Sequence, residues 1–364
     1  MRYVSEYRDS ELARGLIDQI SRRSTVQARF MEFCGGHTAT VFRYGIREVL
    51  PETVTMVSGP GCPVCVTANR DLDKAIAVAH LPGVVIATFG DMIKVPGSRS
   101  SLEETKANGA DVRVVYSAMD ALAIARKEPD RQVVLVGIGF ETTAPTIAAA
   151  ILQAHGERLE NFYVLCLSKL SPPVIKALLD SGEINLHGFI CPGHVSVITG
   201  SQAWDFIACD YGIPCVVAGF EPLDVLHSVG MLVEQVETGC SRVEIAYRRG
   251  VNRQGNRTAQ EMMSEVFRPC PANWRGMGEI PDSGLELAQE YSRFDAEAVF
   301  DIDPGPTVEP DGCLCGEILR GVADPLQCSL FGGACTPEEP VGPCMVSSEG
   351  SCATYYKYGE HDDR

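Results

Sequence analysis

A short stretch near the start of the chain, Ala28-Arg-Phe-Met-Glu-Phe-Cys-Gly-Gly-His-Thr38, decides the fold. It begins with an apolar run that has the length of a buried strand, passes through two glycines and leads into a helical pattern. A strand that enters a helix through a glycine turn is typical of α/β proteins. The stretch therefore predicts a parallel sheet covered by helices on both faces.

The same alternation continues in two series that Glu128-Pro129-Asp130 separates. Each predicted strand is a short apolar run bounded by loop residues or a helical segment. The tripeptide Gly-Phe-Glu follows a predicted strand in the second series at 139–141 and again at 219–221. We predict an α/β domain at 26–127, a similar one at 128–301 and an irregular segment at 302–364. The predicted strands are 28–33, 53–58, 83–89, 112–116, 132–137, 162–167, 187–191 and 214–218.

The composition excludes several classes of protein. With 31 Lys and Arg against 48 Asp and Glu, the net charge is −17, which argues against binding to nucleic acids or anionic membranes. The longest apolar stretch, 75–89, is interrupted by His80 and Pro82 and is too short to span a membrane. The first residues are charged and lack the apolar core of an export signal, so we expect a cytoplasmic protein.

Cysteine is unusually frequent, with 15 residues, six of them after residue 300. Structural disulfides are a poor default for a protein without an export signal. Metal, cluster or redox chemistry is the better explanation, at least for the C-terminal group. We expect bound metal to order the C-terminal segment.

Cys34 ends the first predicted strand, and Thr38 can cap the helix that follows. The carboxyl edge of a parallel sheet is where such folds bind ligands. The positive end of the helix should lower the pKa of the thiol and favour thiolate. His37 could act as a base, a proton donor or a second ligand. The simpler alternative is a small buried cysteine beside a capping threonine.

Cys62 and Cys65 form a C-x-x-C motif between a predicted strand and a helix that starts near Ala68. Thioredoxin-type redox pairs have this setting, whereas a zinc site would need a second such pair, which the chain lacks. A reversible dithiol is therefore favoured. Because both loops follow strands of one parallel sheet, Cys34, Cys62 and Cys65 should lie at the same edge.

The second series places Glu141 and His194 directly after predicted strands. We expect both at the carboxyl edge of the second sheet, facing the cysteines if the two domains close on each other. His194 could equally be an ordinary turn histidine. Gly137-x-Gly139 resembles the start of a dinucleotide loop, but its third glycine position is Thr142, so the evidence for a nucleotide is weak.

The last four cysteines are separated by 7, 9 and 8 residues, a spread that suits an iron–sulfur cluster held by a folded loop segment. Zinc is the alternative, because thiolates bind both metals. Cys313 and Cys315 are spare or redox-active in this interpretation. The four predicted ligands are Cys328, Cys335, Cys344 and Cys352.

Taken together, these motifs resemble the HypD family of hydrogenase maturation factors, and they span nearly the whole chain. The first, second and last of them are highly specific in combination. The matching segments are Phe-Cys-Gly-Gly-His-Thr (33–38), Gly-Pro-Gly-Cys-Pro-Val-Cys (59–65), Gly-Phe-Glu-Thr-Thr-Ala-Pro (139–145), Pro-Gly-His-Val-Ser (192–196) and Cys-Met-Val-Ser-Ser-Glu-Gly-Ser-Cys-Ala-Thr-Tyr-Tyr-Lys-Tyr-Gly (344–359).

The resemblance implies two similar parallel-sheet α/β domains and a Cys-rich iron–sulfur domain formed by the C-terminal tail and an N-terminal helix at residues 1–25. Leu12, Leu16 and Ile20 show helical spacing behind a possible Ser10 cap, which agrees with such a helix over 10–23.

The implied function is a scaffold for the Fe(CN)₂CO unit of [NiFe]-hydrogenases. Cys34 would bind the iron together with a HypC-type small chaperone, His37 would support that site, and a HypE-type partner would donate cyanide. Cys62 and Cys65 would be the redox dithiol. The last four cysteines would hold a [4Fe-4S] cluster, and the hydrogenase large subunit would be an indirect partner.

Two other functions compete with this scaffold. A cluster-dependent thiol–disulfide oxidoreductase would use the C-x-x-C motif and the cluster but would give Cys34 and His37 no role. A structural metal-binding adaptor would tolerate loss of the Cys62–Cys65 pair. The scaffold accounts for all three groups of cysteines and is preferred.

Overall fold

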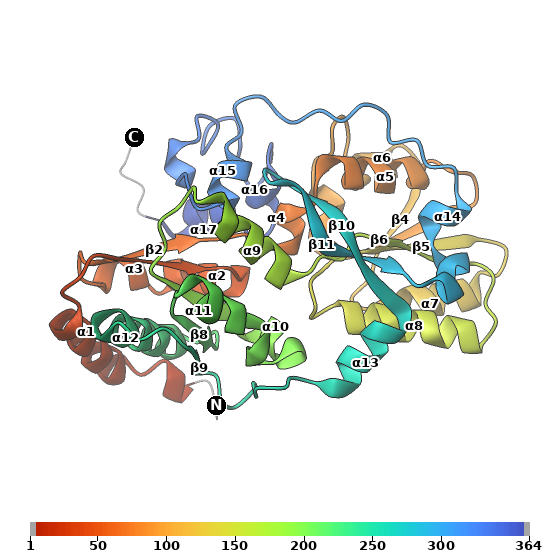
Figure 1. Cartoon of the computed structure of the whole chain (residues 1–364). Coiled ribbons are helices and arrows are strands. Elements are labelled where there is room, and N and C mark those ends of the chain that lie inside the picture. Colours follow the sequence, from red (N-terminus) through yellow and green to blue (C-terminus); the bar gives the residue numbers. More distant parts are fainter. Residues whose placement is uncertain (1–4, 360–364) are drawn as a thin grey trace.

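In the computed structural model, which describes residues 5–359, the strands form two parallel sheets and one antiparallel hairpin. The α/β class with parallel sheets that the sequence predicts is confirmed. The first sheet lies in the left half of Figure 1 and the second in the right half. The strands of the first sheet are, in spatial order, β2 (Val54–Ser58), β1 (Ala28–Glu32), β7 (Gly188–Pro192), β8 (Cys215–Ala218) and β9 (Val243–Ile245). Those of the second are β4 (Asp111–Val114), β3 (Val84–Thr88), β5 (Gln132–Gly137) and β6 (Phe162–Cys166).

The sheets do not follow the division at residue 128 that the sequence predicts. After β2 the chain leaves the first sheet, builds the second from β3 to β6, and returns for β7. The pairing of β1 with β7 places Phe30 opposite Gly188, where a Cβ atom would lie 2.9 Å from the Phe30 ring. This fit joins segments 158 residues apart, and no local pattern in the sequence reports it.

Helices cover both sheets, as expected for parallel strands. Their starts carry ordinary signals, such as the capping box of α7, where Ser117 accepts from Met119 and Asp120 accepts from Ser117. The helices of the α/β region are α2 (Gly35–Arg43), α3 (Ile46–Val49), α4 (Pro63–Val66), α5 (Asn69–Ala79), α6 (Leu102–Ala107), α7 (Ala118–Lys127), α8 (Ala144–Gly156), α9 (Ser171–Ser181), α10 (Gly193–Thr199), α11 (Asp205–Tyr211), α12 (Pro222–Thr238), α13 (Arg257–Val266) and α14 (Ala296–Val299). Short 3₁₀ turns are η1 (Ser5–Tyr7), η2 (Gly90–Lys94), η3 (Ser201–Trp204) and η4 (Gln289–Phe294).

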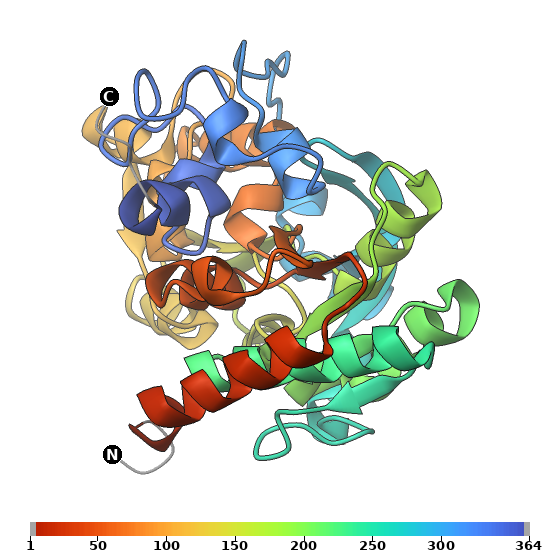
Figure 2. The ribbon, with the colours of Figure 1, turned by 90° about the vertical axis from the view of Figure 1, so that its left-hand side faces the viewer.

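The N-terminal helix α1 (Ser10–Arg23) has the predicted bounds but a different position and a different cap. Figures 1 and 2 show it lying along α12, and its buried Ile20 belongs to the core of the first sheet. Among the described residues it therefore packs on the first sheet's helix layer, whereas a place beside the C-terminal segment was expected. Asp9, and not Ser10, accepts the first backbone N–H groups of the helix.

The hairpin of β10 (Phe267–Trp274) and β11 (Gly278–Leu287) is absent from the predicted strands. Its polar and proline-rich sequence lacks the buried strand pattern. The hairpin reaches the loop after the C-x-x-C motif, where Thr67 bridges to Trp274 and Arg275 donates its backbone N–H to Val66. The hairpin therefore packs against the loop that follows the C-x-x-C motif and supports it.

The C-terminal segment winds over the first sheet as short helices joined by loops, drawn in blue at the top of Figures 1 and 2. Its elements are α15 (Cys315–Leu319), η5 (Pro325–Gln327), α16 (Pro343–Val346) and α17 (Ser351–Tyr358). Residues 1–4 and 360–364, the outer ends of the predicted first and last segments, lie outside the described part. Helix α17 packs on α2, and α16 packs on α4. The segment therefore lies directly over the two cysteine loops of the first sheet.

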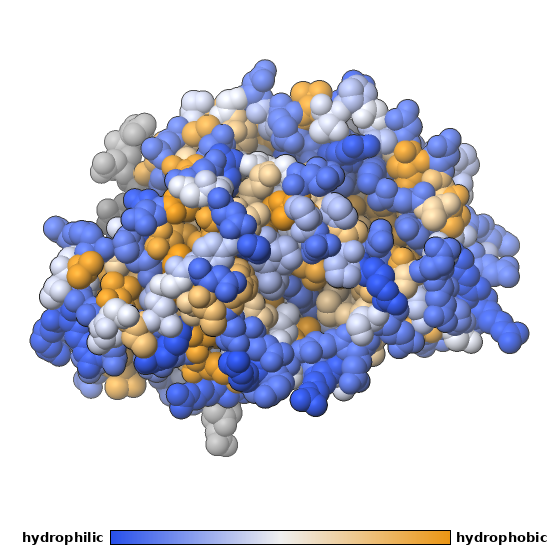
Figure 3. Space-filling view, in the orientation of Figure 1, coloured by the Kyte–Doolittle hydropathy of each residue, from blue (hydrophilic) through white to orange (hydrophobic). Residues whose placement is uncertain are grey.

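Polar side chains dominate the face drawn in Figure 3, and hydrophobic ones form only small groups on it. Within residues 5–359 no helix has the length and apolar character needed to cross a membrane.

The packing of α1 on α12 predicts a large effect of truncating Ile20, which is 1% exposed. Ile20→Ala should lower the free energy of unfolding by about 2–5 kcal/mol, because it leaves a cavity in a closed core. Chemical denaturation followed by circular dichroism measures this. The matched control is Leu12→Ala on the same helix, whose side chain is 58% exposed and whose loss should change little. Equal effects of the two substitutions would contradict the packing described.

Candidate functional site

Cys34 occupies the turn between β1 and α2, as predicted, and the residue as a whole is partly exposed. It is itself the N-cap residue of α2, so Thr38 lies inside the helix and does not cap it. Burial raises the pKa of the Cys34 thiol to about 12, although the backbone N–H groups of Gly36 and His37 act in the opposite direction. The expected lowering of this pKa by the helix is therefore wrong, because desolvation outweighs it.

Two carboxylates add to this effect. The charges of Glu349 and Glu32 both raise the pKa of Cys34. Glu349 belongs to the C-terminal segment and lies against Gly35, where a Cβ atom would be 2.3 Å from that of Glu349. Only glycine leaves room for this contact, so Gly35 admits the C-terminal segment beside Cys34, whereas Gly36 faces the Phe220 ring.

Glu32 is a residue of the site that the sequence interpretation missed. It is 2% exposed and accepts hydrogen bonds from the Thr38 hydroxyl at 2.6 Å and the Cys34 N–H at 3.1 Å. Burial raises its pKa to about 7, against the lowering effect of these hydrogen bonds. The signal in the sequence is an acidic residue directly after the apolar pair Phe30-Met31 of a predicted strand, since a buried carboxylate needs polar partners.

His37 is completely buried, and its two ring nitrogens differ. Nε2 lies 3.0 Å from the carbonyl oxygen of Gly219, which can only accept, so Nε2 carries the proton. Nδ1 is buried and has no partner among the described residues. Burial also lowers the pKa of His37 to about 4. The ring is therefore neutral near pH 7 and offers a free lone pair, which suits a base or a ligand and not a proton donor.

The prediction that His194 lies at the edge of the second sheet is wrong. It follows β7, which pairs with β1, so it lies at the edge of the same sheet as His37. The Phe220 ring lies between the two histidines, with ring centroids 4.7 Å from His37 and 3.8 Å from His194. The Thr40 hydroxyl holds this loop by donating to the Phe220 carbonyl at 2.6 Å. Phe220 belongs to the second Gly-Phe-Glu tripeptide, and its stacking role was not foreseen.

Cys62 and Cys65 form a disulfide at the start of α4, with Cα atoms 5.2 Å apart. Their loop touches the Cys34 loop directly: Gly35 donates to the Gly61 carbonyl at 3.3 Å, and a Cβ atom on Gly61 would lie 2.2 Å from the Cys34 nitrogen. The predicted convergence of the two cysteine loops at one sheet edge is therefore present in the fold.

Glu141 is held elsewhere. It follows β5 of the second sheet and accepts hydrogen bonds from the N–H and hydroxyl of Ser171, both at 2.8 Å. These contacts fix the start of α9, and burial raises the pKa of the carboxyl group. Its side-chain hydrogen bonds are to the start of α9, and the expected orientation of Glu141 toward the cysteines stays a prediction.

The four predicted cluster ligands are all buried, with exposed fractions of 1–8%. Electrostatic interactions connect Cys335 with Cys328 and Cys352, and Cys344 with Cys352. The Val341 N–H donates to the Cys335 sulfur at 3.3 Å. Cys344 also lies 2.7 Å, sulfur to sulfur, from Cys315, which the sequence interpretation left without a partner.

Within the described residues, no three His, Cys, Asp or Glu side chains are arranged around a point that could hold a metal ion. The donor set nevertheless suits an iron–sulfur cluster, because buried thiols that lie near one another and accept backbone N–H bonds are its usual surroundings.

The C-terminal thiols lie next to the disulfide. The Cys65 sulfur is 4.0 Å from the carbonyl oxygen of Pro343, the residue before Cys344. The three groups of cysteines that the sequence singles out are thus brought into one region, which the C-terminal segment covers.

The charge of Glu349 predicts the reactivity of Cys34. Glu349→Gln removes a charge that raises the pKa of Cys34, so this pKa should fall and more thiolate should form. We expect alkylation at pH 8 to be roughly three- to tenfold faster, equivalent to half to one pKa unit. Mass spectrometry of the peptide containing Cys34 measures the rate. Glu338→Gln, an exposed change in the same segment, should leave it unchanged; a slower reaction in Glu349→Gln would refute the electrostatic account.

Comparison with known proteins agrees with the resemblance seen in the motifs. The family model HypD, described as "Hydrogenase formation hypA family", matches residues 11–359. The chain is 46% identical over 373 residues to hydrogenase maturation factor HypD of Cupriavidus necator, covering all of this chain and 98% of the relative. It is 44% identical over 372 residues to the Escherichia coli K12 protein of the same name, covering all of this chain and 99% of that protein. The chain therefore belongs to the HypD family of hydrogenase maturation factors.

Proposed function

We propose that this protein is the scaffold on which the Fe(CN)₂CO unit of [NiFe]-hydrogenases is assembled. Cys34 binds the iron together with a thiolate of a HypC-type chaperone, and a HypE-type protein supplies the cyanide. The convergence of Cys34, the Cys62–Cys65 pair and the free lone pair of His37 at one sheet edge carries this proposal.

The electrostatics of the site suit a cationic cargo. The charges of Glu32 and Glu349 disfavour a bare thiolate at Cys34 but attract a metal cation. A metal ion displaces the proton of a coordinating thiol, so the high pKa of Cys34 does not prevent ligation. Thiolate is also a suitable ligand for the soft, electron-rich iron that binds cyanide and carbon monoxide. Without iron, the Cys34 thiol therefore keeps its proton, and binding of iron would displace that proton.

The disulfide beside this site is the redox element of the proposal. Opening the Cys62–Cys65 bond takes up two electrons and two protons, and closing it returns them. Both cysteines are buried: the exposed fraction is 4% for Cys62 and 0% for Cys65. A thiol oxidoreductase that acts on a protein disulfide needs a sulfur its substrate can reach, so this burial disfavours the competing function.

Cys328, Cys335, Cys344 and Cys352 would hold a [4Fe-4S] cluster. When bound, such a cluster supplies one-electron chemistry. The chain's own contribution is to keep these thiols buried and to place α16 against α4, so that the cluster segment touches the C-x-x-C loop.

Substitutions in the two cysteine loops should have different effects. Cys34→Ala should abolish iron retention, because the protein's thiolate ligand is lost, whereas Cys62→Ala should keep the iron and block maturation. Infrared spectra in the cyanide and carbonyl stretching region, on protein purified anaerobically with its small partner, measure this directly. Bands present in wild type and absent from Cys34→Ala are the expected result.

Cys209→Ala, at an exposed thiol on α11, is the matched control and should retain all bands. Equal loss of iron in Cys34→Ala and Cys62→Ala would contradict the division of roles. Silence in the wild type, with its partner fully bound and its cluster intact, would favour an electron-transfer protein.

Serine substitution of each of the four C-terminal ligands should lower the iron and acid-labile sulfide of the anaerobic protein. Cys270→Ser, outside the segment, serves as the control. Cys315→Ser tests whether the neighbour of Cys344 takes part, since the two sulfurs are in contact. Zinc without sulfide in the wild-type protein would replace the cluster by a structural zinc site.

A further inference from the structure

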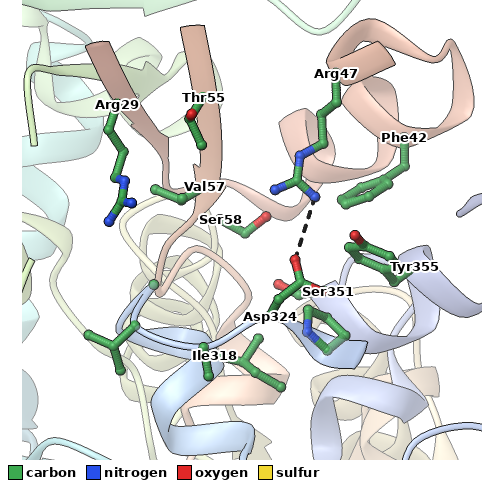
Figure 4. A pocket seen from close by; sticks show the side chains of 14 residues that line it. Arg29, Phe42, Arg47, Thr55, Val57, Ser58, Ile318, Asp324, Ser351 and Tyr355 are labelled. Atoms are coloured by element: carbon green, nitrogen blue, oxygen red, sulfur yellow. Dashed lines mark ion pairs between the residues drawn. The ribbon is translucent and has the colours of Figure 1, made fainter. Parts of the chain in front are cut away.

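A pocket of about 220 Å³ lies between β1, β2 and the C-terminal segment, and its lining includes no cysteine. Figure 4 shows Arg29 and Arg47 pointing into it from opposite sides, with Thr55, Val57 and Ser58 between them. The opposite wall comes from residues 318–325 and from α17. The pocket therefore connects the first sheet with the segment that carries the C-terminal cysteines.

This part of the first sheet departs from a rule for parallel sheets. Both faces of such sheets are normally covered. Arg29 and Thr55, which are register partners on β1 and β2, are exposed and line the pocket. The open face is small and polar, which points to a small polar ligand and not to a missing helix.

The two arginines differ in how they are held. The Arg47 guanidinium donates to the Met56 carbonyl at 2.7 Å and packs over the rings of Phe42 and Tyr355. It lies 3.9 Å from Asp324, an ion pair marked in Figure 4. No hydrogen bond or ion pair holds the Arg29 guanidinium among residues 5–359. The pocket thus presents one fixed and one free guanidinium against a single carboxylate.

Such an excess of positive charge is uncommon in this chain, whose net charge is −17. The planar fork of guanidinium donors matches carboxylate and phosphate oxygens. The Thr55 and Ser351 hydroxyls line the same space and add donors. The volume is below the usual range for drug-sized ligands, which restricts the occupant to a small molecule.

We propose that this pocket binds a small metabolite through a carboxylate or phosphate group held between Arg29 and Arg47. The occupant would bridge β1 and β2 to residues 318–325 and so fasten the C-terminal segment to the first sheet. Gly321 already packs there, where a Cβ atom would lie 2.7 Å from the Met31 side chain. The inference does not depend on the proposed function, because it uses neither the cysteines nor iron.

Thermal unfolding of the full chain tests the proposal, with inorganic phosphate and succinate as probes and sodium chloride at matched ionic strength as the reference. A ligand that binds only the folded state raises Tm in a saturable manner. Wild type and Arg22→Gln, an exposed change on α1, should show this rise, and Arg29→Gln should lose it. The probe that acts identifies the anionic group.

Labelling with phenylglyoxal and mass spectrometry provides a second measurement that does not depend on stability. The effective probe should reduce modification of Arg29 several-fold and leave Arg22 unchanged. The proposal is overturned if neither anion raises Tm beyond chloride, or if Arg29→Gln retains the full rise. Protection by a tetraglutamate peptide, with no effect of either small anion, would also overturn it in favour of a protein-docking surface.

Discussion

The whole site depends on two glycines at which three segments of the chain pack closely against one another. Gly61 packs on the backbone of Phe33 and Cys34, and Gly35 packs on Glu349. A side chain at either glycine would overlap its neighbour, so the loops could not meet. These contacts place the disulfide and the C-terminal segment beside Cys34. The glycines of both cysteine motifs are therefore needed because they have no side chain, which lets the neighbouring segments pack against their backbone.

Electrostatics then decide what the site can hold. Removing water from Cys34 and setting carboxylates around it makes the anionic thiolate unfavourable, and burial makes a charged His37 equally unfavourable. The apo site consequently stays neutral at the thiol and the imidazole. A cation reverses this balance, because it replaces the proton of Cys34 and meets the lone pair of a neutral ring. These electrostatics are therefore consistent with the metal cation of the proposed function.

Local patterns in the sequence were sufficient to predict both cysteine loops and every strand of the two parallel sheets except the three-residue β9. They did not report which strands pair, because the contact of Phe30 with Gly188 depends on segments far apart in the chain. The same limit explains Glu141, whose position after a strand is local but whose partner Ser171 is not. It also explains the pKa of Cys34: the helix that should lower this pKa is adjacent, whereas the burial that raises it, helped by the charge of Glu349, comes from the tertiary fold, with Glu349 315 residues away.

Burial assigns different partners to the two kinds of cysteine in this region. The residue Cys34 is partly exposed, so in the proposed function it would be the cysteine closest to a ligand from another protein. Cys62 and Cys65 are closed off from solvent, and the Cys65 sulfur faces the backbone just before Cys344. In the proposed function, this burial would favour electron entry through groups inside the chain, such as the C-terminal thiols. The fold thus separates a partly exposed thiol from a buried disulfide, joined by the contact of Gly61 with Cys34, and the proposed function would assign the metal to the first and the electrons to the second.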